Sequence, residues 1–235
     1  MEDLPKQVKI LKIYAIVLTV IVLAFIGYTL TLNSGHYKEL TAERINIVEK
    51  TGKIRMVISN KELQHPGRMD DKDLPKRDRP AGMIFFNDEG DEDGGLVYDG
   101  DKNGASMTYS FDQYKNDQIM QLQYEQENGK SNRFRSYGLK LWDRNEAFTL
   151  SKQLAYFDSL ANLKADTAAY SNGVKKFRDA GYTHQRLFAG KNAKGEVGLF
   201  LNDANGKPRL NIYINKQNQP VIETLDESGR VISSK

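Results

Sequence analysis

Two oxygen-rich segments carry the residue types best suited to chemistry. The second of them, Asp99-Gly-Asp101-Lys-Asn103-Gly, has oxygen-bearing side chains at positions one, three and five and glycine at position six. This is the first half of an EF-hand calcium loop. The pattern then fails, because position twelve should be a bidentate glutamate and is Ser110. Asp99, Asp101 and Asn103 are therefore a weak candidate for a calcium site of another kind, and no other cofactor is indicated.

The first segment, residues 88–95, is acidic and ends in two glycines. Aspartate, asparagine and glycine are also the residues that β-turns prefer, since they tolerate or stabilise turn conformations. The alternative interpretation of both segments is a pair of hairpin turns with no ligand.

A hydrolase would need converging carboxylates or an activated histidine. Asp143 and Glu146 lie just after Trp142, which could serve as a platform for a sugar ring, but spacing in the sequence does not bring the two carboxylates together. The three histidines, at positions 36, 65 and 184, are far apart along the chain. The sequence contains no Gly-x-Ser-x-Gly elbow, P-loop or paired-histidine metal motif.

The composition excludes further classes. Cysteine is absent, which removes disulfides, thiolate nucleophiles and cysteine-based zinc sites. The 34 basic and 31 acidic residues nearly cancel and form no basic cluster, so no nucleic-acid partner is expected.

The element that positions the whole chain is an apolar segment near its start. Twenty residues, Ile13–Leu32, contain no charge, and twelve of them are Ile, Leu, Val or Phe. At about 1.5 Å per residue, such a helix spans roughly 30 Å, the hydrocarbon thickness of a bilayer. The segment predicts a transmembrane helix over 13–32. A cleaved signal peptide is the main alternative, but its apolar region should be shorter and followed by a small-x-small cleavage site.

The charges around this segment predict its orientation. Lys6, Lys9 and Lys12 precede it, whereas Lys38 and Arg44 are the basic residues closest behind it. The positive-inside rule then keeps residues 1–12 cytoplasmic as an N-terminal tail. Residues 33–43 become a spacer, and residues 44–235 fold outside the cytoplasm, anchored to the lipid bilayer of the cell membrane as a single-pass protein.

Behind the spacer the pattern is that of strands. Ile45 and Ile47, and then Ile54, Met56 and Ile58, alternate with polar residues across a turn that ends in glycine at position 52, which predicts a hairpin. Further turns are expected at residues 195, 206, 218–220 and 229, roughly eleven residues apart. The fold class expected is mainly β: an antiparallel meander closed as a barrel, stacked as a sandwich or arranged like a propeller.

The middle of the chain adds strands and a helical interruption. Apolar residues alternate within three stretches, so each set is expected to share one face: Met107, Tyr109 and Phe111; Met120, Leu122 and Tyr124; Tyr137, Leu139 and Leu141. The apolar spacing changes to three and four residues within 147–181, which predicts one or two short helices ending near Gly181.

Three stretches carry a resemblance to other proteins. Residues 44–60, the stretch from Arg79 through Gly90 and the stretch from Ser110 to Tyr114 resemble an uncharacterised bacterial family of single-span membrane proteins. This resemblance implies a bacterial origin and a β-rich exported domain, and it assigns no activity.

These observations favour a non-enzymatic envelope protein: a membrane-anchored module that binds or scaffolds an unknown protein or glycan partner. The alternative is an exported hydrolase acting on cell-wall or polysaccharide material.

Overall fold

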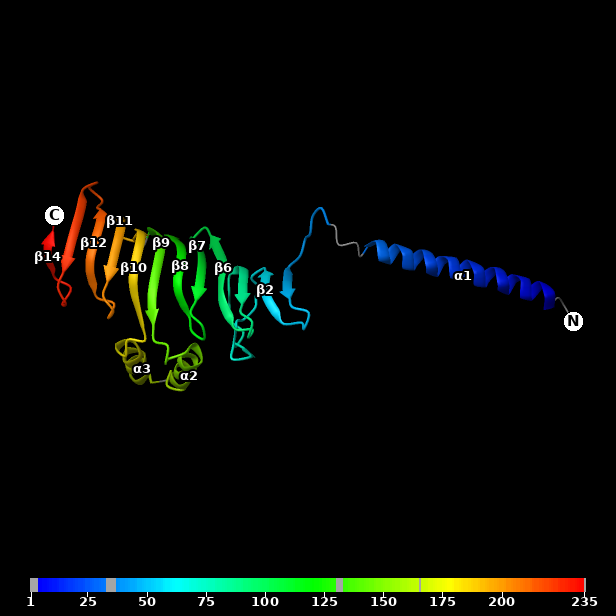
Figure 1. Ribbon diagram of the computed structural model, residues 1–235, viewed down its shortest axis with the longest axis horizontal. Coiled ribbons are helices and arrows are strands. Elements are labelled where there is room, and N and C mark those ends of the chain that lie inside the picture. Colours follow the sequence, from blue (N-terminus) through cyan, green and yellow to red (C-terminus); the bar gives the residue numbers. More distant parts are fainter. Residues whose placement is uncertain (1–3, 33–36, 130–132, 165, 235) are drawn as a thin grey trace. The chain divides into compact units, whose positions relative to one another are not determined.

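The computed structural model describes residues 4–32, 37–129, 133–164 and 166–234. The chain divides into two compact units, Met1–Ala42 and Glu43–Lys235. The first contains one helix and the second a large antiparallel sheet with two short helices, as Figure 1 shows. The expected mainly β architecture behind an apolar helix is confirmed.

Helix α1 spans Leu4–Leu32 and is long and apolar enough to cross a membrane. Pro5 lies in its first turn, where a missing backbone N–H costs nothing. The hydroxyls of Thr19 and Thr31 donate to the carbonyl oxygens of Ala15 and Tyr28 at 2.8 and 2.7 Å. These bonds satisfy hydroxyl groups that an apolar environment would otherwise leave unpaired. The helix begins nine residues before the expected span, because most residues of its first turns are the good helix formers Leu, Lys and Gln.

The sheet has twelve strands in the order β1-β2-β5-β6-β7-β8-β9-β10-β11-β12-β13-β14. The strand bounds are β1 Arg44–Val48, β2 Ile54–Ser59, β5 Ala81–Phe86, β6 Glu92–Asp101, β7 Gly104–Asp112, β8 Gln118–Asn128, β9 Arg133–Arg144, β10 Thr183–Lys191, β11 Val197–Asn202, β12 Pro208–Ile214, β13 Pro220–Leu225 and β14 Val231–Ser234. Every neighbouring pair is antiparallel, so the expected meander is confirmed.

The sheet does not close in any of the ways expected from the sequence. Strands β1 and β14 end the strand order and do not pair with each other, so the described part of the chain forms one open sheet rather than a barrel, sandwich or propeller. Figure 1 shows the strands side by side in one layer. Turn spacing in the sequence fixes neighbouring strand pairs but carries no information on whether the two edge strands meet.

The hairpin turns follow the expected chemistry. Gly52, Gly195, Gly206 and Gly229 have φ between 75° and 86°, and Asn218 has φ 59°. Glycine and asparagine enter this left-handed region at little steric cost, which is why they recur at these turns. The expected β1–β2 hairpin is present, with Ile45 opposite Ile58.

Two glycines allow close approach within the sheet. Gly138 on β9 lies opposite Gly190 on β10, and both have φ 156°. A Cβ atom on Gly190 would lie 2.1 Å from the carbonyl oxygen of Tyr137, closer than real Cβ atoms come. The two strands therefore adopt this geometry only because neither residue has a side chain.

The helical interruption lies between β9 and β10. Helices α2 (Leu150–Ala161) and α3 (Thr167–Asp179) begin at side-chain caps, Thr149 and Asp166, that accept hydrogen bonds from backbone N–H groups. Gly181 follows α3 with φ 66°, as expected for a residue that ends a helix. Aromatic contacts join the pair to the segments that connect it with β9 and β10. Phe148 is stacked on Tyr182 at 3.7 Å between ring centroids, and Phe177 of α3 contacts both rings.

The buried core is small and lies near the N-terminal end of the sheet. Val57, Ile84 and Phe86 form it, with Val57 opposite Ile84 across β2 and β5. The segment between these strands contains a short hairpin, β3 (Arg68–Met69) and β4 (Lys72–Asp73). Its His65 ring contacts Phe86 edge to face at 4.7 Å. This segment was not anticipated from the sequence, since the mixed charges there indicate a solvated loop.

Candidate interaction surface

One row of apolar side chains crosses almost the whole sheet. Each of its residues lies directly opposite the next on the neighbouring strand, and directly opposed residues share a face. In strand order the row is Ile45, Ile58, Met83, Leu96, Tyr109, Leu122, Leu139, Ala189, Leu199, Ile212 and Ile222. Eleven of the twelve strands therefore contribute an apolar or aromatic residue, and we call this the central row.

The rows two residues to either side lie on the same face and are also apolar. One contains Ile47, Met56, Phe85, Gly94, Phe111, Met120, Leu141, Leu187, Leu201 and Leu210. The other contains Ala81, Tyr98, Met107, Tyr124, Tyr137, Lys191, Val197, Ile214 and Pro220. Lys191 is the one charged residue in the three rows, which together we call the apolar face.

The three apolar stretches expected from the sequence lie together on this face. Tyr109, Leu122 and Leu139 are neighbours in the central row, and their flanking residues are neighbours in the outer rows. The prediction that each set shares one face is confirmed, and the register adds that all three sets share the same face.

Much of the apolar face is exposed. Leu122 is 53% exposed and Tyr98 is 56% exposed, and seven further residues of the face between β2 and β13 are more than a third exposed: Ile58, Met107, Tyr137, Val197, Ile212, Ile214 and Ile222. Isolated exposed apolar side chains are ordinary on protein surfaces, but a contiguous patch of this size marks a contact surface.

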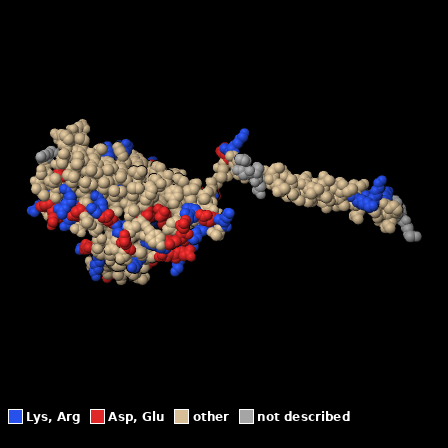
Figure 2. Space-filling view, in the orientation of Figure 1, with Lys and Arg blue, Asp and Glu red and all other residues tan. Residues whose placement is uncertain are grey.

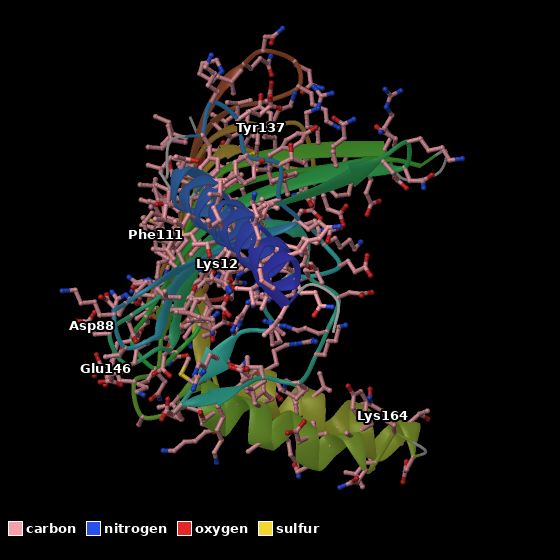
Figure 3. All side chains as sticks on the ribbon, turned by 90° about the vertical axis from the view of Figure 1, so that its right-hand side faces the viewer. Lys12, Asp88, Phe111, Tyr137, Glu146 and Lys164 are labelled. Atoms are coloured by element: carbon pink, nitrogen blue, oxygen red, sulfur yellow. The ribbon has the colours of Figure 1, made fainter. Side chains whose placement is uncertain are left out.

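The figures show this face from two directions. In Figure 2 the charged side chains gather along the lower border of the sheet, toward α2 and α3, and the strands above them are nearly free of charge. In Figure 3, Phe111 and Tyr137 lie on the same side of the sheet. Within the unit Glu43–Lys235, the described helices α2 and α3 lie beyond the ends of the strands and do not cover them in the view of Figure 1.

A shallow depression of about 380 Å³ lies in the middle of the apolar face. Leu96, Met107, Tyr109, Leu122 and Tyr124 line it. Its lining offers apolar and aromatic contact with no charged group, so the chemistry it supports is burial of apolar surface rather than recognition of an ion.

The opposite face is different in character. Its equivalent row is Asn46, Val57, Ile84, Gly95, Ser110, Gln121, Lys140, Phe188, Phe200, Asn211 and Glu223. This row is apolar where the core lies, polar in the middle and aromatic near β10 and β11. The sheet's buried core and its large exposed apolar surface are therefore on opposite faces.

The candidate calcium residues lie at the β6–β7 hairpin. Asp101 accepts hydrogen bonds from the backbone N–H and the side-chain amide of Asn103, at 2.7 and 2.9 Å. Asp99 accepts from the N–H of Gly100 at 2.9 Å and pairs with Lys61 at 3.2 Å. The pKa of Asp99 lies below its usual value, first because of Lys61.

The side-chain oxygens of Asp99 and Asp101 therefore already have partners within the chain. This is the arrangement that the alternative interpretation, a hairpin turn, describes. Among the described residues, no group of three acidic or histidine side chains is placed to hold a metal ion.

The acidic segment 88–95 forms the β5–β6 turn and the first residues of β6, and the turn contacts Lys115. The Lys115 ammonium lies 2.5 Å from Asp91, 2.9 Å from Glu89 and 3.1 Å from Asp70. Asp91 is buried, so its charge requires this partner. The pKa of Lys115 is raised, first by Asp91 and then by Glu89. The cluster joins three separate turns, which is a structural role.

A second set of titratable groups lies beside the core. The Arg79 guanidinium donates to both carboxylate oxygens of Glu92 at 2.8 and 2.6 Å, and both side chains are largely buried. Nearby, burial raises the pKa of Asp112 to about 8, with further contributions from Glu92 and Asp117 that outweigh the opposing effect of Arg144. Oδ1 of Asp112 has no hydrogen-bond partner among the described groups. The sequence does not identify these groups, because nothing local marks an aspartate at the end of a strand as buried.

The hydrolase candidates do not converge. Asp143 forms an ion pair with Arg186, and Glu146 is exposed. His65 is 4% exposed, its Nδ1 accepts from the N–H of Gly67 at 3.1 Å, and burial lowers its pKa. His36 lies outside the described residues. None of these contacts polarises a nucleophile.

Comparison of the chain with protein families, curated proteins and solved structures finds no match.

Proposed function

We propose that this chain is a single-pass, membrane-anchored protein of the bacterial cell envelope, and that its sheet unit is a docking module outside the cytoplasm. The observation that carries the proposal is the central row, which continues across eleven strands and is left uncovered. A chain that uses a sheet only as a scaffold would bury such a face or make it polar.

Helix α1 supports the anchoring part of the proposal. Burying its uncharged segment in lipid is favourable by about 0.3–0.6 kcal/mol for each Ile, Leu, Val or Phe at the helix centre. Lys6, Lys9 and Lys12 lie on its N-terminal side and favour a cytoplasmic N-terminus. The sheet unit is then exported, where an anchored module meets its partner at high local concentration.

Docking through the apolar face suits a binding or scaffolding role better than catalysis. The face has no acid in its three rows and contains Lys191 as its one charge. It therefore offers contact area and shape, and its proton-transfer groups are limited to the tyrosine hydroxyls and the Lys191 ammonium.

The proposal is tested by photocrosslinking in native membranes. A benzoylphenylalanine replaces Leu122 on the apolar face in one full-length variant and its neighbour Gln121 on the opposite face in another. Adducts are expected from position 122 and not from position 121. Equal yields at both positions, or no adduct at 122, would contradict a docking role for the face.

Anchoring and orientation need a separate test. Full-length protein should remain with membranes through carbonate and high-salt extraction, and a reporter that fluoresces only in the cytoplasm should stay dark when fused after Lys235. Soluble full-length protein would refute the anchor, and a bright fusion would refute the orientation.

A further inference from the structure

We propose that the partner on the apolar face is a second copy of this chain, packed face to face so that two single-layer sheets form a two-layer sandwich. This inference rests on the proposed docking role and names its occupant. Sheets packed in this way lie about 10 Å apart with their side chains interdigitated.

The composition of the face is self-complementary. A twofold contact places the same patch on both partners, so each residue type must tolerate the same types opposite it. Apart from Lys191, aliphatic and aromatic residues dominate the three rows, so two such surfaces bury each other mainly through apolar contacts. Lys191 is the last residue of β10 and lies in an outer row, at the margin of the contact. A strongly charged partner would find this single charge as its only counter-charge in the three rows.

The size of the face matches a stable dimer. Between β5 and β13 the face covers nine strands. At about 4.8 Å between strands and about 7 Å between rows, with side-chain width added, the strip measures roughly 40 Å by 20 Å, or about 800 Å². A stable interface of standard size buries about 800 Å² on each partner. A second copy supplies a surface of equal length, whereas a single helix would cover only part of it.

The middle of the central row identifies the residue to test. Leu122 is sixth of the eleven residues in the central row, with five on either side. A twofold axis at the middle of this row brings Leu122 close to Leu122 of the second copy. An axis at the middle of the nine-strand strip, at Leu139, still lies only one strand away from Leu122. The adjacent Gln121 points to the opposite face and stays away from its own copy in the same arrangement.

A membrane surface is the competing occupant. Segments that lie on membranes combine an apolar face with a basic border that meets anionic headgroups. Here the border carries both signs, as the Lys61–Asp99 pair at one end of β6 illustrates. This mixed border favours a protein partner.

The test uses single cysteines, because the natural chain contains none. Full-length Leu122→Cys and Gln121→Cys variants are treated in native membranes with a short bismaleimide. Leu122→Cys is expected to give a product of twice the chain mass in high yield, and Gln121→Cys at most a trace. Full-length Leu122→Lys, purified in detergent, should lose the dimer that the natural chain and Gln121→Lys retain.

Each other outcome has a defined meaning. Equal cross-linking at both positions reflects random collision, and it overturns the inference. No cross-link at 122 together with a monomeric natural chain also overturns it. If the photocrosslinker at position 122 then captures a different protein or a lipid, the docking role is supported and the second copy is refuted as the partner. If the photocrosslinker captures nothing, both proposals are refuted.

Discussion

Alanine substitution should separate the buried core from the apolar face by its cost in stability. Ile84 is 1% exposed and packs over Gly95, where a Cβ atom would lie 3.0 Å from the Ile84 side chain. Removing most of this side chain leaves a cavity, and such substitutions cost about 2–5 kcal/mol. Leu122 is 53% exposed in the single chain. Full burial of a leucine is worth about 1.5–3 kcal/mol, so Leu122→Ala should cost roughly 1 kcal/mol or less.

The assay is urea unfolding of Glu43–Lys235, the compact unit that contains every described strand, at a concentration where sedimentation shows a monomer. Trp142, the single tryptophan, reports unfolding by its fluorescence. Ile84→Ala should lower the midpoint clearly and Leu122→Ala only slightly. If the two variants lose similar stability as monomers, the apolar face is covered within one chain and the reasoning fails.

Three further predictions follow from the opposite face, the sheet geometry and the β6–β7 hairpin. The pKa of Asp112 is raised to about 8, so the folded chain holds a proton that the unfolded chain releases, and stability falls as pH rises from about 4 to about 8. Asp112→Asn should remove most of that slope and add a few kcal/mol at pH 8, whereas an unchanged slope in pH-dependent unfolding would refute the buried carboxyl. Gly190→Val should destabilise the sheet by more than 2 kcal/mol, roughly the cost of a strained backbone and a steric clash, and a thermal melt like that of the natural chain would contradict the close approach. Calcium should bind only in the millimolar range, since the oxygens of Asp101 already have partners, and a micromolar calorimetric signal lost in Asp101→Ala would show a true site.

The elements of the fold follow closely from local sequence signals. Glycine or asparagine at residues 52, 195, 206, 218 and 229 marks turns that need positive φ, and alternation within the intervening segments marks strands. Both signals depend on one turn or one strand at a time. The helical interruption is equally local, because its apolar spacing and the glycine at 181 identify it without any tertiary contact.

The candidate surface depends on information that no single segment contains. In the sequence, Tyr109, Leu122 and Leu139 are each typical of a buried strand face. The sequence gives no sign that the sheet lacks a second layer to cover that face. Register across eleven strands creates the continuous row, and the open strand order leaves it exposed. The buried Asp112 and the Lys115 cluster are similar, since their environment comes from turns far apart in the chain.

Cysteine labelling in intact cells tests the central claim most directly. In the single chain Leu122 is the more exposed of the adjacent pair Leu122 and Gln121, so an uncovered sheet would label faster at Leu122→Cys. With a membrane-impermeant maleimide, the account predicts the reverse order in cells: Gln121→Cys labels from outside and Leu122→Cys is protected. Faster labelling at Leu122→Cys would contradict a covered face, and labelling of Gln121→Cys only after lysis would contradict the exported sheet.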